Sequence, residues 1–459
     1  MTALALDLSL LQPAQAQTFT TLYGFTDRDP ITGTNTDGAN PNAVILSGNT
    51  LYATTFEGGS VFSGTVFAVN TDGMDFTNLH SLLYSSDGYS PQGGMVLSGN
   101  TLYGTASAGG VGGNGTIFSI TTDGTVFSIL HVFSGTDGSG PGGQLFLSGD
   151  TLYGTTSLGG ANFGGSVFAI KTNGTFLFTN LYSFTQTDST YGTNSDGGQP
   201  SAGVVLSGST LYGVTSVGGR YADGTVFAVN TDGTGFTNLH TFTGNPTDGA
   251  SPRAELIVSG NTLYGTGVGG GTHGNGSVFA IQTDGTGFTN LYSFTTQSGL
   301  YFTNSDGAGP QGKLFLSGNT LYGTAVYGGM YGWGTVFALN INGTGFTSLH
   351  NFTGSDDGAN PMSGVIVTNN TLYGTAFYGG SSGYSGNGTV FSLSLEPAVG
   401  APQLTINRLG TNVLLTWLAA GFVLQSTTNL VSPVWITVPG QNTVTNPISG
   451  IRKFYRLSQ

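Results

Sequence analysis

Four short motifs recur seven times along this chain of 459 residues, and this repetition restricts its possible folds more than any other feature. The motif "TLYG", or a close variant, recurs at intervals of 51, 50, 59, 52, 58 and 51 residues. Each copy follows a "DGxxP" motif and precedes a "GTVF"-like motif, and an "FTNLH"-like motif completes all units but the last. Such a period indicates that one small supersecondary unit is repeated through the fold.

Each unit contains four apolar runs that are typical of short β-strands. In the fourth unit these runs are "VVLSG", "TLYGVT", "GTVFAVN" and "FTNLHTF". An Asp-Gly or Asn-Gly turn joins the third and fourth runs in six units, and its glycine supplies the positive φ that a tight hairpin requires. These turns, together with 80 glycines and 12% aromatic residues, indicate an all-β protein.

The number of fourth strands indicates how the units are arranged. The last unit reads "GTVFSLSLEP" and has no fourth strand, whereas "FTTLYGF" at 19–25 stands alone before the first unit. A ring explains this displacement, because pairing the two chain ends in one sheet removes two open edges. We therefore predict a seven-bladed β-propeller closed by the N-terminal strand. A β-helix or an open array of units is the alternative.

Small residues are expected to line the axis of this ring. The second residue after each "DGxxP" proline is small in all seven units. It begins the innermost strand, where seven strands converge and leave little room for side chains. These residues are Ala43, Gly93, Gly143, Ala202, Ala254, Gly312 and Ser363.

Charge is scarce and unevenly distributed along the chain. Charged residues make up 7% of the sequence, and the net charge is −13. All 22 acidic residues lie at or before Glu396, together with only five basic ones, so this segment has a net charge of −17. An acidic surface disfavours nucleic acids and anionic membranes. No apolar run is long enough to span a bilayer, and without cysteine there are no disulfide bonds or thiolate metal sites.

Composition divides the chain into three segments. Residues 1–17 contain an apolar run followed by "AQA", and we interpret them as a truncated signal peptide, with a disordered leader as the alternative. Residues 18–398 contain the propeller repeats, and residues 399–459 form a different module. A signal peptide predicts that the protein is secreted, extracellular or displayed at the cell surface.

The repeats resemble a known family. The stretch "LSGNTLYGTASAGGVGGNGTIFSITTDGT" at 97–125 and its six counterparts are similar to the bacterial GloVer tandem repeat. The unit is also broadly kelch-like in plan, although it lacks the kelch tryptophan. The resemblance covers residues 19–395 and implies an exported β-propeller, of the kind found in secreted bacterial proteins with varied C-terminal anchors.

The last segment reads as a separate β-module. The stretch "TNVLLTWLAAGFVLQSTTNL" alternates as β-strands do, and "WITVPG" and "KFYRLSQ" follow it. Trp417 and Trp435 are expected in its core. The segment resembles a small fibronectin-type or immunoglobulin-like sandwich, although about 60 residues are few for a complete one.

The ionisable residues form no recognisable catalytic pattern. The "DGxxP" aspartates are expected to cap their own turns, with a Ca²⁺ site built from one or two of them as the alternative. Histidine and tyrosine alternate at one position of the fourth strand, where we expect them to pack at the rim of the blades, too far apart to share a metal ion. We therefore assign no catalytic residue, metal ligand or cofactor. The alternating residues are Tyr23, His80, His131, Tyr182, His240, Tyr292 and His350.

One sector of the ring combines aromatic and polar residues and is the candidate ligand-binding site. Aromatic rings beside hydrogen-bonding groups suit sugars, whose C–H faces stack on them. Packing of the loops against one another is the alternative explanation for these aromatic residues. The candidate residues are Arg253, Glu255, Lys313, Tyr327, Tyr331, Trp333, Phe377, Tyr378 and Tyr384.

These patterns favour a monomeric extracellular module that binds a glycan or a surface protein without catalysing a reaction. We expect neither a nucleic-acid partner nor insertion into a membrane. Two alternatives stay open: a polysaccharide lyase or hydrolase that uses the channel mouth, and a purely structural repeat protein.

Overall fold

The computed structural model describes residues 17–395 and, after them, residues 404–409, 412–417, 423–427, 436–438, 443–447 and 453–458. The described residues fall into two compact units, one of residues 19–392 and the other containing the described residues from 404 onward. The predicted signal peptide, apart from residue 17, and the predicted domain junction at 398–399 lie outside the described residues. In the described part, no helix is long and apolar enough to cross a membrane.

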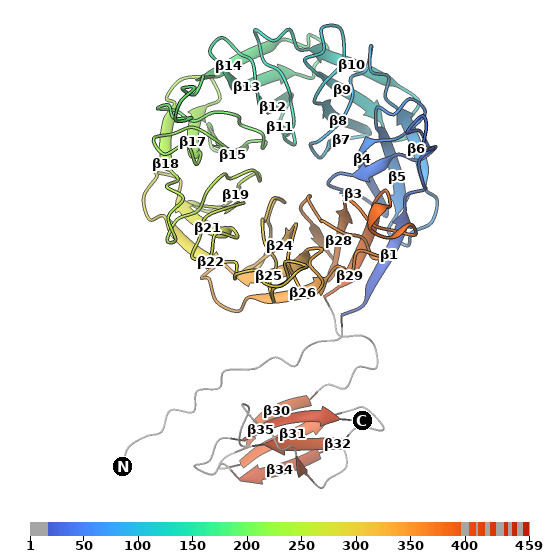
Figure 1. Ribbon diagram of the computed structural model, residues 1–459, viewed down its shortest axis with the longest axis vertical. Helices are drawn as coiled ribbons and strands as arrows, with labels where there is room; N and C mark the ends of the chain where they lie inside the picture. The colour runs from blue at the N-terminus through green and yellow to red at the C-terminus, as the bar shows by residue number, and fades with distance from the viewer. Residues whose placement is uncertain are drawn as a thin grey trace. The chain divides into compact units, whose positions relative to one another are not determined.

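Residues 19–392 form a ring of seven antiparallel sheets, which we call blades 1 to 7 in chain order (Figure 1). Blade 1 contains β3 (Ile45–Ser47), β4 (Thr50–Glu57), β5 (Thr65–Asn70) and β6 (Thr77–Ser81), and the short β2 (Ala39–Pro41) pairs with β4 as well. Blade 2 contains β7 (Val96–Ser98), β8 (Thr101–Ala106), β9 (Thr116–Thr121) and β10 (Phe127–Val132). Blade 3 contains β11 (Phe146–Ser148), β12 (Thr151–Thr156), β13 (Phe163–Lys171) and β14 (Phe178–Thr185).

The other four blades repeat this plan. Blade 4 contains β15 (Val205–Ser207), β16 (Thr210–Thr215), β17 (Thr225–Asn230) and β18 (Thr237–Thr241). Blade 5 contains β19 (Ile257–Ser259), β20 (Thr262–Gly267), β21 (Ser277–Gln282) and β22 (Thr289–Ser293). Blade 6 contains β23 (Phe315–Ser317), β24 (Thr320–Ala325), β25 (Thr335–Asn340) and β26 (Thr347–Asn351). Blade 7 contains β27 (Ile366–Thr368), β28 (Thr371–Ala376), β29 (Thr389–Ser394) and β1 (Phe19–Gly24), and the one-turn helix η1 (Gly383–Ser385) lies in its β28–β29 loop.

The N-terminal strand closes the ring, as the sequence predicts. In the sheet order β1-β29-β28-β27, β1 pairs with the strand that comes last in the propeller repeats, and Figure 1 shows the blue β1 beside the orange β29. Next to this pairing, the Phe25 amide donates to the Gly388 carbonyl at 3.1 Å. The Phe25 side chain is 1% exposed and packs in the core with Phe67 of blade 1. Blade 7 is therefore completed by both ends of the repeat region.

Each blade is packed around a phenylalanine of its third strand. In blade 2, Phe118 is fully buried and lies opposite Gly104 of β8. A Cβ atom at Gly104 would lie 2.5 Å from the Cζ atom of Phe118, so glycine leaves room for the ring in this blade, whereas blade 1 has Ala53 opposite Phe67. This packing explains the glycine of the "TLYG" motif.

The histidine or tyrosine of each fourth strand joins neighbouring blades. In blades 1 to 6, the pairing register between the third and fourth strands shifts beside this residue. Such a shift is typical of a β-bulge, which changes the direction of the side chain. Its ring stacks on the phenylalanine that begins the "FTNLH"-like motif of the next blade, with centroids 3.8–4.0 Å apart. The seven stacked pairs are Tyr23–Phe76, His80–Phe127, His131–Phe178, Tyr182–Phe236, His240–Phe288, Tyr292–Phe346 and His350–Phe19.

The same histidine or tyrosine is hydrogen-bonded to a "DGxxP" aspartate in every blade. Each donates to the carboxylate of the aspartate that follows it in the chain, at 2.7–3.0 Å. Asp306 also accepts from the Thr295 amide at 2.9 Å and from the Thr295 hydroxyl, so it caps its own turn. The structural role predicted for these aspartates is therefore what the structure shows. The bonded pairs are Tyr23–Asp37, His80–Asp87, His131–Asp137, Tyr182–Asp196, His240–Asp248, Tyr292–Asp306 and His350–Asp357.

These tyrosines are expected to make stability fall at alkaline pH. Burial, the hydrogen bond to the aspartate and the charge of that aspartate raise the pKa of Tyr23, Tyr182 and Tyr292 above its ordinary value. Unfolded tyrosine loses its proton near pH ~10 while the folded form keeps it, so stability is fully present below that pH and is lost as the pH rises above it. Thermal midpoints measured between pH 8 and pH 11 should show this loss. Tyr182→Phe should show a smaller loss, and an equal loss would contradict the assignment.

The described strands of the C-terminal unit form two three-stranded sheets. One has the order β30-β31-β34 and the other the order β33-β32-β35. Leu415 and Leu424, one from each sheet, are fully buried in a common cluster with Val438, Val444 and Tyr455. Trp435 and the side chain of Trp417 lie outside the described residues, so their predicted core positions stay predictions. The strands are β30 (Leu404–Leu409), β31 (Asn412–Trp417), β32 (Val423–Thr427), β33 (Ile436–Thr437), β34 (Thr443–Pro447) and β35 (Phe454–Ser458).

Candidate functional site

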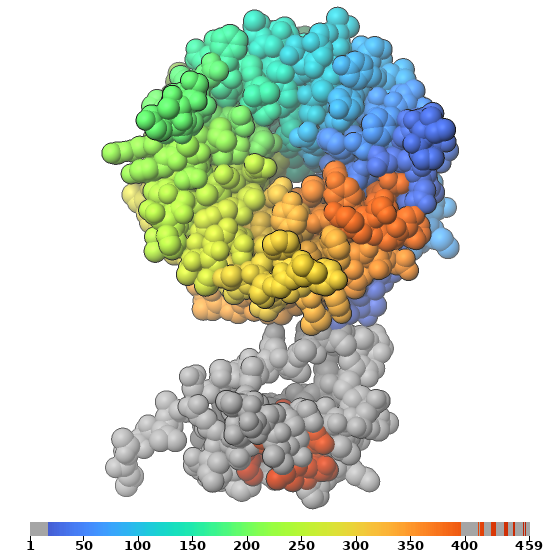
Figure 2. Space-filling view, in the orientation of Figure 1, coloured from blue at the N-terminus to red at the C-terminus, as the bar shows by residue number. Residues whose placement is uncertain are grey.

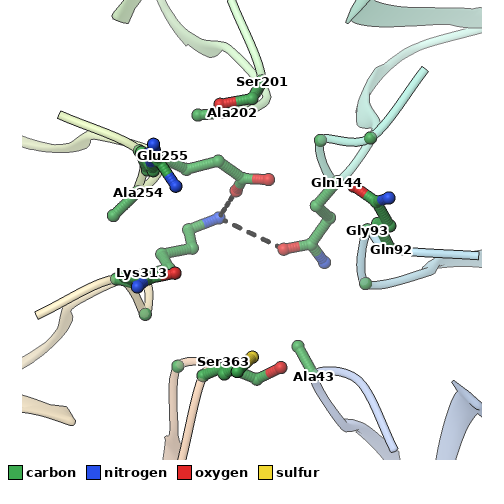
Figure 3. A pocket seen from close by; sticks show the side chains of 18 residues that line it. Ala43, Gln92, Gly93, Gln144, Ser201, Ala202, Ala254, Glu255, Lys313 and Ser363 are labelled. Carbon is green, nitrogen blue, oxygen red and sulfur yellow. Dashed lines mark hydrogen bonds and ion pairs between the residues drawn. The ribbon is translucent and has the colours of Figure 1, made fainter. Parts of the chain in front are cut away.

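The segments that enter the innermost strands surround a central cavity of about 110 Å³. Figure 3 shows them converging from all sides. The seven small residues predicted for the axis, from Ala43 to Ser363, all line this cavity, which confirms their predicted position. At Gly143 a Cβ atom would lie 2.2 Å from the Gly203 amide nitrogen of the next blade. The small side chains therefore allow the blades to approach closely at the axis.

A polar bridge crosses this cavity. Lys313 of blade 6 forms an ion pair with Glu255 of blade 5, with Nζ 2.7 Å from Oε2. The same ammonium group donates to Oε1 of Gln144 in blade 3 at 3.5 Å, and Figure 3 shows the side chains meeting from different sides of the ring. The Gln144 amide in turn donates to the Met95 carbonyl at 2.7 Å. Glu255 is 8% exposed, so Lys313 compensates the charge of a buried carboxylate.

A second, apolar cavity of about 390 Å³ lies further along the innermost strands. Its residues follow those of the polar cavity in sequence, so it lies toward the turns that end these strands. The two cavities share Gln144 and Lys313, which places the polar bridge at their junction. The apolar lining consists of Val44, Ile45, Ile257, Val258, Leu314, Phe315, Leu316, Val365 and Ile366.

Arg253 lines the polar cavity but takes no part in the bridge. Its side chain is exposed, and among the described residues it makes neither an ion pair nor a side-chain hydrogen bond. The structure thus places the three polar candidate residues, Arg253, Glu255 and Lys313, around one cavity. It adds Gln144, which sequence reasoning missed because the equivalent position is alanine or glycine in four other blades.

The predicted aromatic residues form a second group, which we call the aromatic sector: Tyr327, Tyr331, Trp333, Phe377, Tyr378 and Tyr384. Trp333 of blade 6 stacks on Tyr384 of blade 7, with ring centroids 4.2 Å apart and planes inclined by 30°. Tyr384 also approaches Tyr378 at 5.8 Å, and Tyr378 meets Phe377 edge-on at 4.9 Å. None of the six lines either described cavity, so the structure separates them from the polar bridge.

Contacts within the protein bury only part of the aromatic sector. Trp333 lies against the backbone of Gly354, where a Cβ atom would be 2.7 Å from the indole. Tyr327, Tyr331 and Tyr384 nevertheless keep 47%, 48% and 49% of their surface exposed. Packing between loops therefore accounts for part of the sector, while about half of three rings faces solvent.

An ion pair beside the aromatic sector was missed by sequence reasoning. Arg28 of the β1–β2 loop pairs with Glu57 at the end of β4. Burial, together with the nearby charges of Tyr384, Glu57 and Tyr327, raises the pKa of Tyr378, and Arg28 opposes this effect. The scarcity of charge could have drawn attention to this pair, because Arg28 is one of only five basic residues before Glu396.

Three long loops rise on the face that Figure 2 presents, at residues 26–40 in blue, 185–199 in green and 295–309 in yellow. At the base of each loop, the side-chain amide of an asparagine donates hydrogen bonds to two backbone carbonyls of the loop. In the loop at 295–309, for example, Asn304 donates to the carbonyls of Thr295 and Gly307. The tips expose large apolar side chains. These are Ile31 (92%), Tyr191 (78%), Leu300 (86%), Tyr301 (72%) and Phe302 (68%).

The loop at 295–309 extends the aromatic sector. The Tyr301 carbonyl lies so close to Gly332 that a Cβ atom there would be 2.3 Å away, which places the loop directly beside Tyr331 and Trp333. In Figure 2 this yellow loop and the orange β28–β29 loop project from the same face. Across the described part of the chain, no group of three histidine, aspartate or glutamate residues is arranged to hold a metal ion.

The family model of the Gloeobacter/Verrucomicrobia repeat matches residues 10–195, 189–303 and 299–405. The chain belongs to this family. The match spans the whole propeller and confirms the resemblance seen in the sequence. No curated protein matches this member of the Gloeobacter/Verrucomicrobia repeat family significantly in sequence.

Solved β-propellers share the fold at low sequence identity. An oligogalacturonate lyase in complex with manganese is 11% identical, with a TM-score of 0.49 over 83% of this chain and 99% of its own. A chain of the nidogen/laminin complex is 13% identical, with a TM-score of 0.39 over 65% and 91%. PorZ, a surface component of the type-IX secretion system of Porphyromonas gingivalis, is 13% identical, with a TM-score of 0.45 over 91% and 56%. Binding proteins and enzymes both use this fold, so the similarity specifies no function.

Proposed function

We propose that this protein is a secreted or cell-surface propeller that binds extracellular glycans through the aromatic sector without catalysing a reaction. The observation that carries the proposal is the run of aromatic contacts from Trp333 through Tyr384 to Tyr378, in which Tyr384 keeps 49% of its surface exposed. Tyrosine and tryptophan offer flat faces for sugar C–H groups, and the phenol groups supply hydrogen bonds.

Polar groups beside the rings favour a sugar over a purely apolar ligand. The Arg28–Glu57 ion pair lies next to Tyr378, so a ligand stacked on the sector meets both a donor and an acceptor. Glycan hydroxyl groups both donate and accept, which this pair can satisfy. The net charge of −17 up to Glu396 opposes polyanions, so neutral glycans are the expected ligands.

Binding to a glycan array, followed by calorimetry, tests the proposal. We expect Tyr384→Ala and Trp333→Ala to weaken the affinity for the selected glycan at least about tenfold, the effect of losing one stacking contact of roughly 1.5 kcal/mol. Tyr221→Ala is the matched control, because Tyr221 is 50% exposed in blade 4, away from the sector.

Three outcomes would contradict this proposal. The absence of any glycan ligand would favour a structural protein or a protein partner. Equal losses in the Tyr384 and Tyr221 variants would show that the sector is not the site. Turnover of a polysaccharide by the wild-type protein would show that it is an enzyme.

A further inference from the structure

The polar cavity, which we call the cup, is lined by up to three consecutive positions of each blade. The residue after the "DGxxP" proline lines the cavity in blades 2 to 7, and we assign it to the mouth; the larger of these residues are Gln92, Ser201, Arg253, Gln311 and Met362. The next residue is one of the seven small ones and forms the wall. The third position supplies the floor, where Lys313 joins Glu255 and Gln144. Figure 3 shows the floor residues reaching across the opening.

The charge of this cup is opposite to that of the propeller. Arg253 and Lys313 are two of the five basic residues before Glu396, a segment with 22 acidic residues. Glu255 compensates Lys313 at 2.7 Å, whereas Arg253 has no carboxylate partner among the described residues. The charged groups of the cup therefore sum to +1, which complements a monoanion.

We propose that this cup binds the carboxylate end of a small hydroxycarboxylate. Arg253 presents the planar donor pair that matches a carboxylate. The amide groups of Gln92 and Gln311 at the mouth offer hydrogen-bond partners for adjacent hydroxyl groups, and about 110 Å³ admits the end of a small ligand and excludes a peptide or nucleic-acid chain.

The cup selects such a ligand without aromatic stacking. No aromatic residue lines the polar cavity, so recognition there depends on charge and on hydrogen bonds in a narrow opening. A phosphate monoester carries more negative charge than the single uncompensated Arg253 complements. The cup is separate from the aromatic sector, so this inference goes beyond the proposed glycan binding and does not depend on it.

Calorimetry with D-glucuronate and D-glucose tests the inference, since these sugars differ in the carboxylate. The full-length protein should bind glucuronate and show no heat of binding with glucose. Arg253→Gln should weaken glucuronate binding at least tenfold, whereas Arg220→Gln, which changes an arginine outside the cup, should leave it unchanged. Ser201→Glu places a carboxylate at the mouth and should abolish binding while Arg253 is kept.

The outcomes separate this inference from the proposed function. Tyr384→Ala should bind glucuronate as the wild type does, so the two sites succeed or fail independently. Equal affinity for glucose and glucuronate would overturn the inference. So would absence of glucuronate binding by the wild type, or unchanged binding in both the Arg253 and Ser201 variants when their thermal midpoints match that of the wild type.

Discussion

Deleting residues 1–25 is expected to unfold the propeller, whereas deleting residues 1–17 is expected to leave it intact. The longer deletion removes β1 and exposes the hydrogen-bonding edge of β29. It also removes Phe25, which is 1% exposed, and Phe19, which stacks on His350 at 3.8 Å. Loss of one buried phenylalanine side chain costs about 3–5 kcal/mol, a large part of the stability of a typical domain.

Circular dichroism during heating and size-exclusion chromatography check this result. The shorter deletion keeps β1 and serves as the matched control for loss of the N-terminal residues. Phe25→Ala should lower the thermal midpoint without removing the strand, because it leaves a cavity between blades 7 and 1. If the protein lacking residues 1–25 stays monomeric with the midpoint of the control, closure of the ring by β1 is not required for folding.

Replacing Asp306 by alanine is expected to destabilise the propeller by about 3–5 kcal/mol, the cost of leaving several buried donors without their charged acceptor. The Asp306 carboxylate is 2% exposed and accepts from the Tyr292 hydroxyl at 2.7 Å, the Thr295 amide and the Thr295 hydroxyl. The variant also frees the Tyr292 ring that stacks on Phe346 of the next blade.

Thermal unfolding of Asp306→Ala and Asp284→Ala measures this effect under the same conditions. Asp284 lies in an exposed hairpin turn and bonds only Thr286, so its replacement should change the midpoint much less. The thermal midpoint of Asp306→Asn should lie between those of the two alanine variants, because the amide keeps one acceptor oxygen but loses the charge. Similar midpoints for Asp306→Ala and Asp284→Ala would show that the inter-blade bond contributes little.

The fold was predictable because its signals are local and repeated. An Asp-Gly turn between two apolar runs specifies a hairpin by itself, and seven copies of one unit remove the ambiguity that a single copy would leave. The unpaired motif at 19–25 predicted the closure that the β1–β29 pairing confirms. The small residues at the axis were predictable for the same reason, since convergence affects all seven blades alike.

The site was less predictable because it depends on residues that differ from their counterparts in the other blades. Arg253, Glu255 and Lys313 were predicted as candidate residues, but Gln144, which Lys313 contacts, comes from the far side of the ring, 169 residues from Lys313. The Arg28–Glu57 pair was missed because it joins the β1–β2 loop to the end of β4, and no sequence motif indicates that these lie close together.

The sequence alone determined the number of blades, the strand that closes the ring and the small residues at its axis, because each follows from turns and spacings within a unit. Only the tertiary structure decided which exceptional side chains meet. It joined Lys313 to Glu255 and Gln144 across the axis, and it kept Trp333 and Tyr384 apart from them. The physical reason is that ring closure brings residues from distant blades within bonding distance, and the positions at which they meet depend on the geometry of the whole ring.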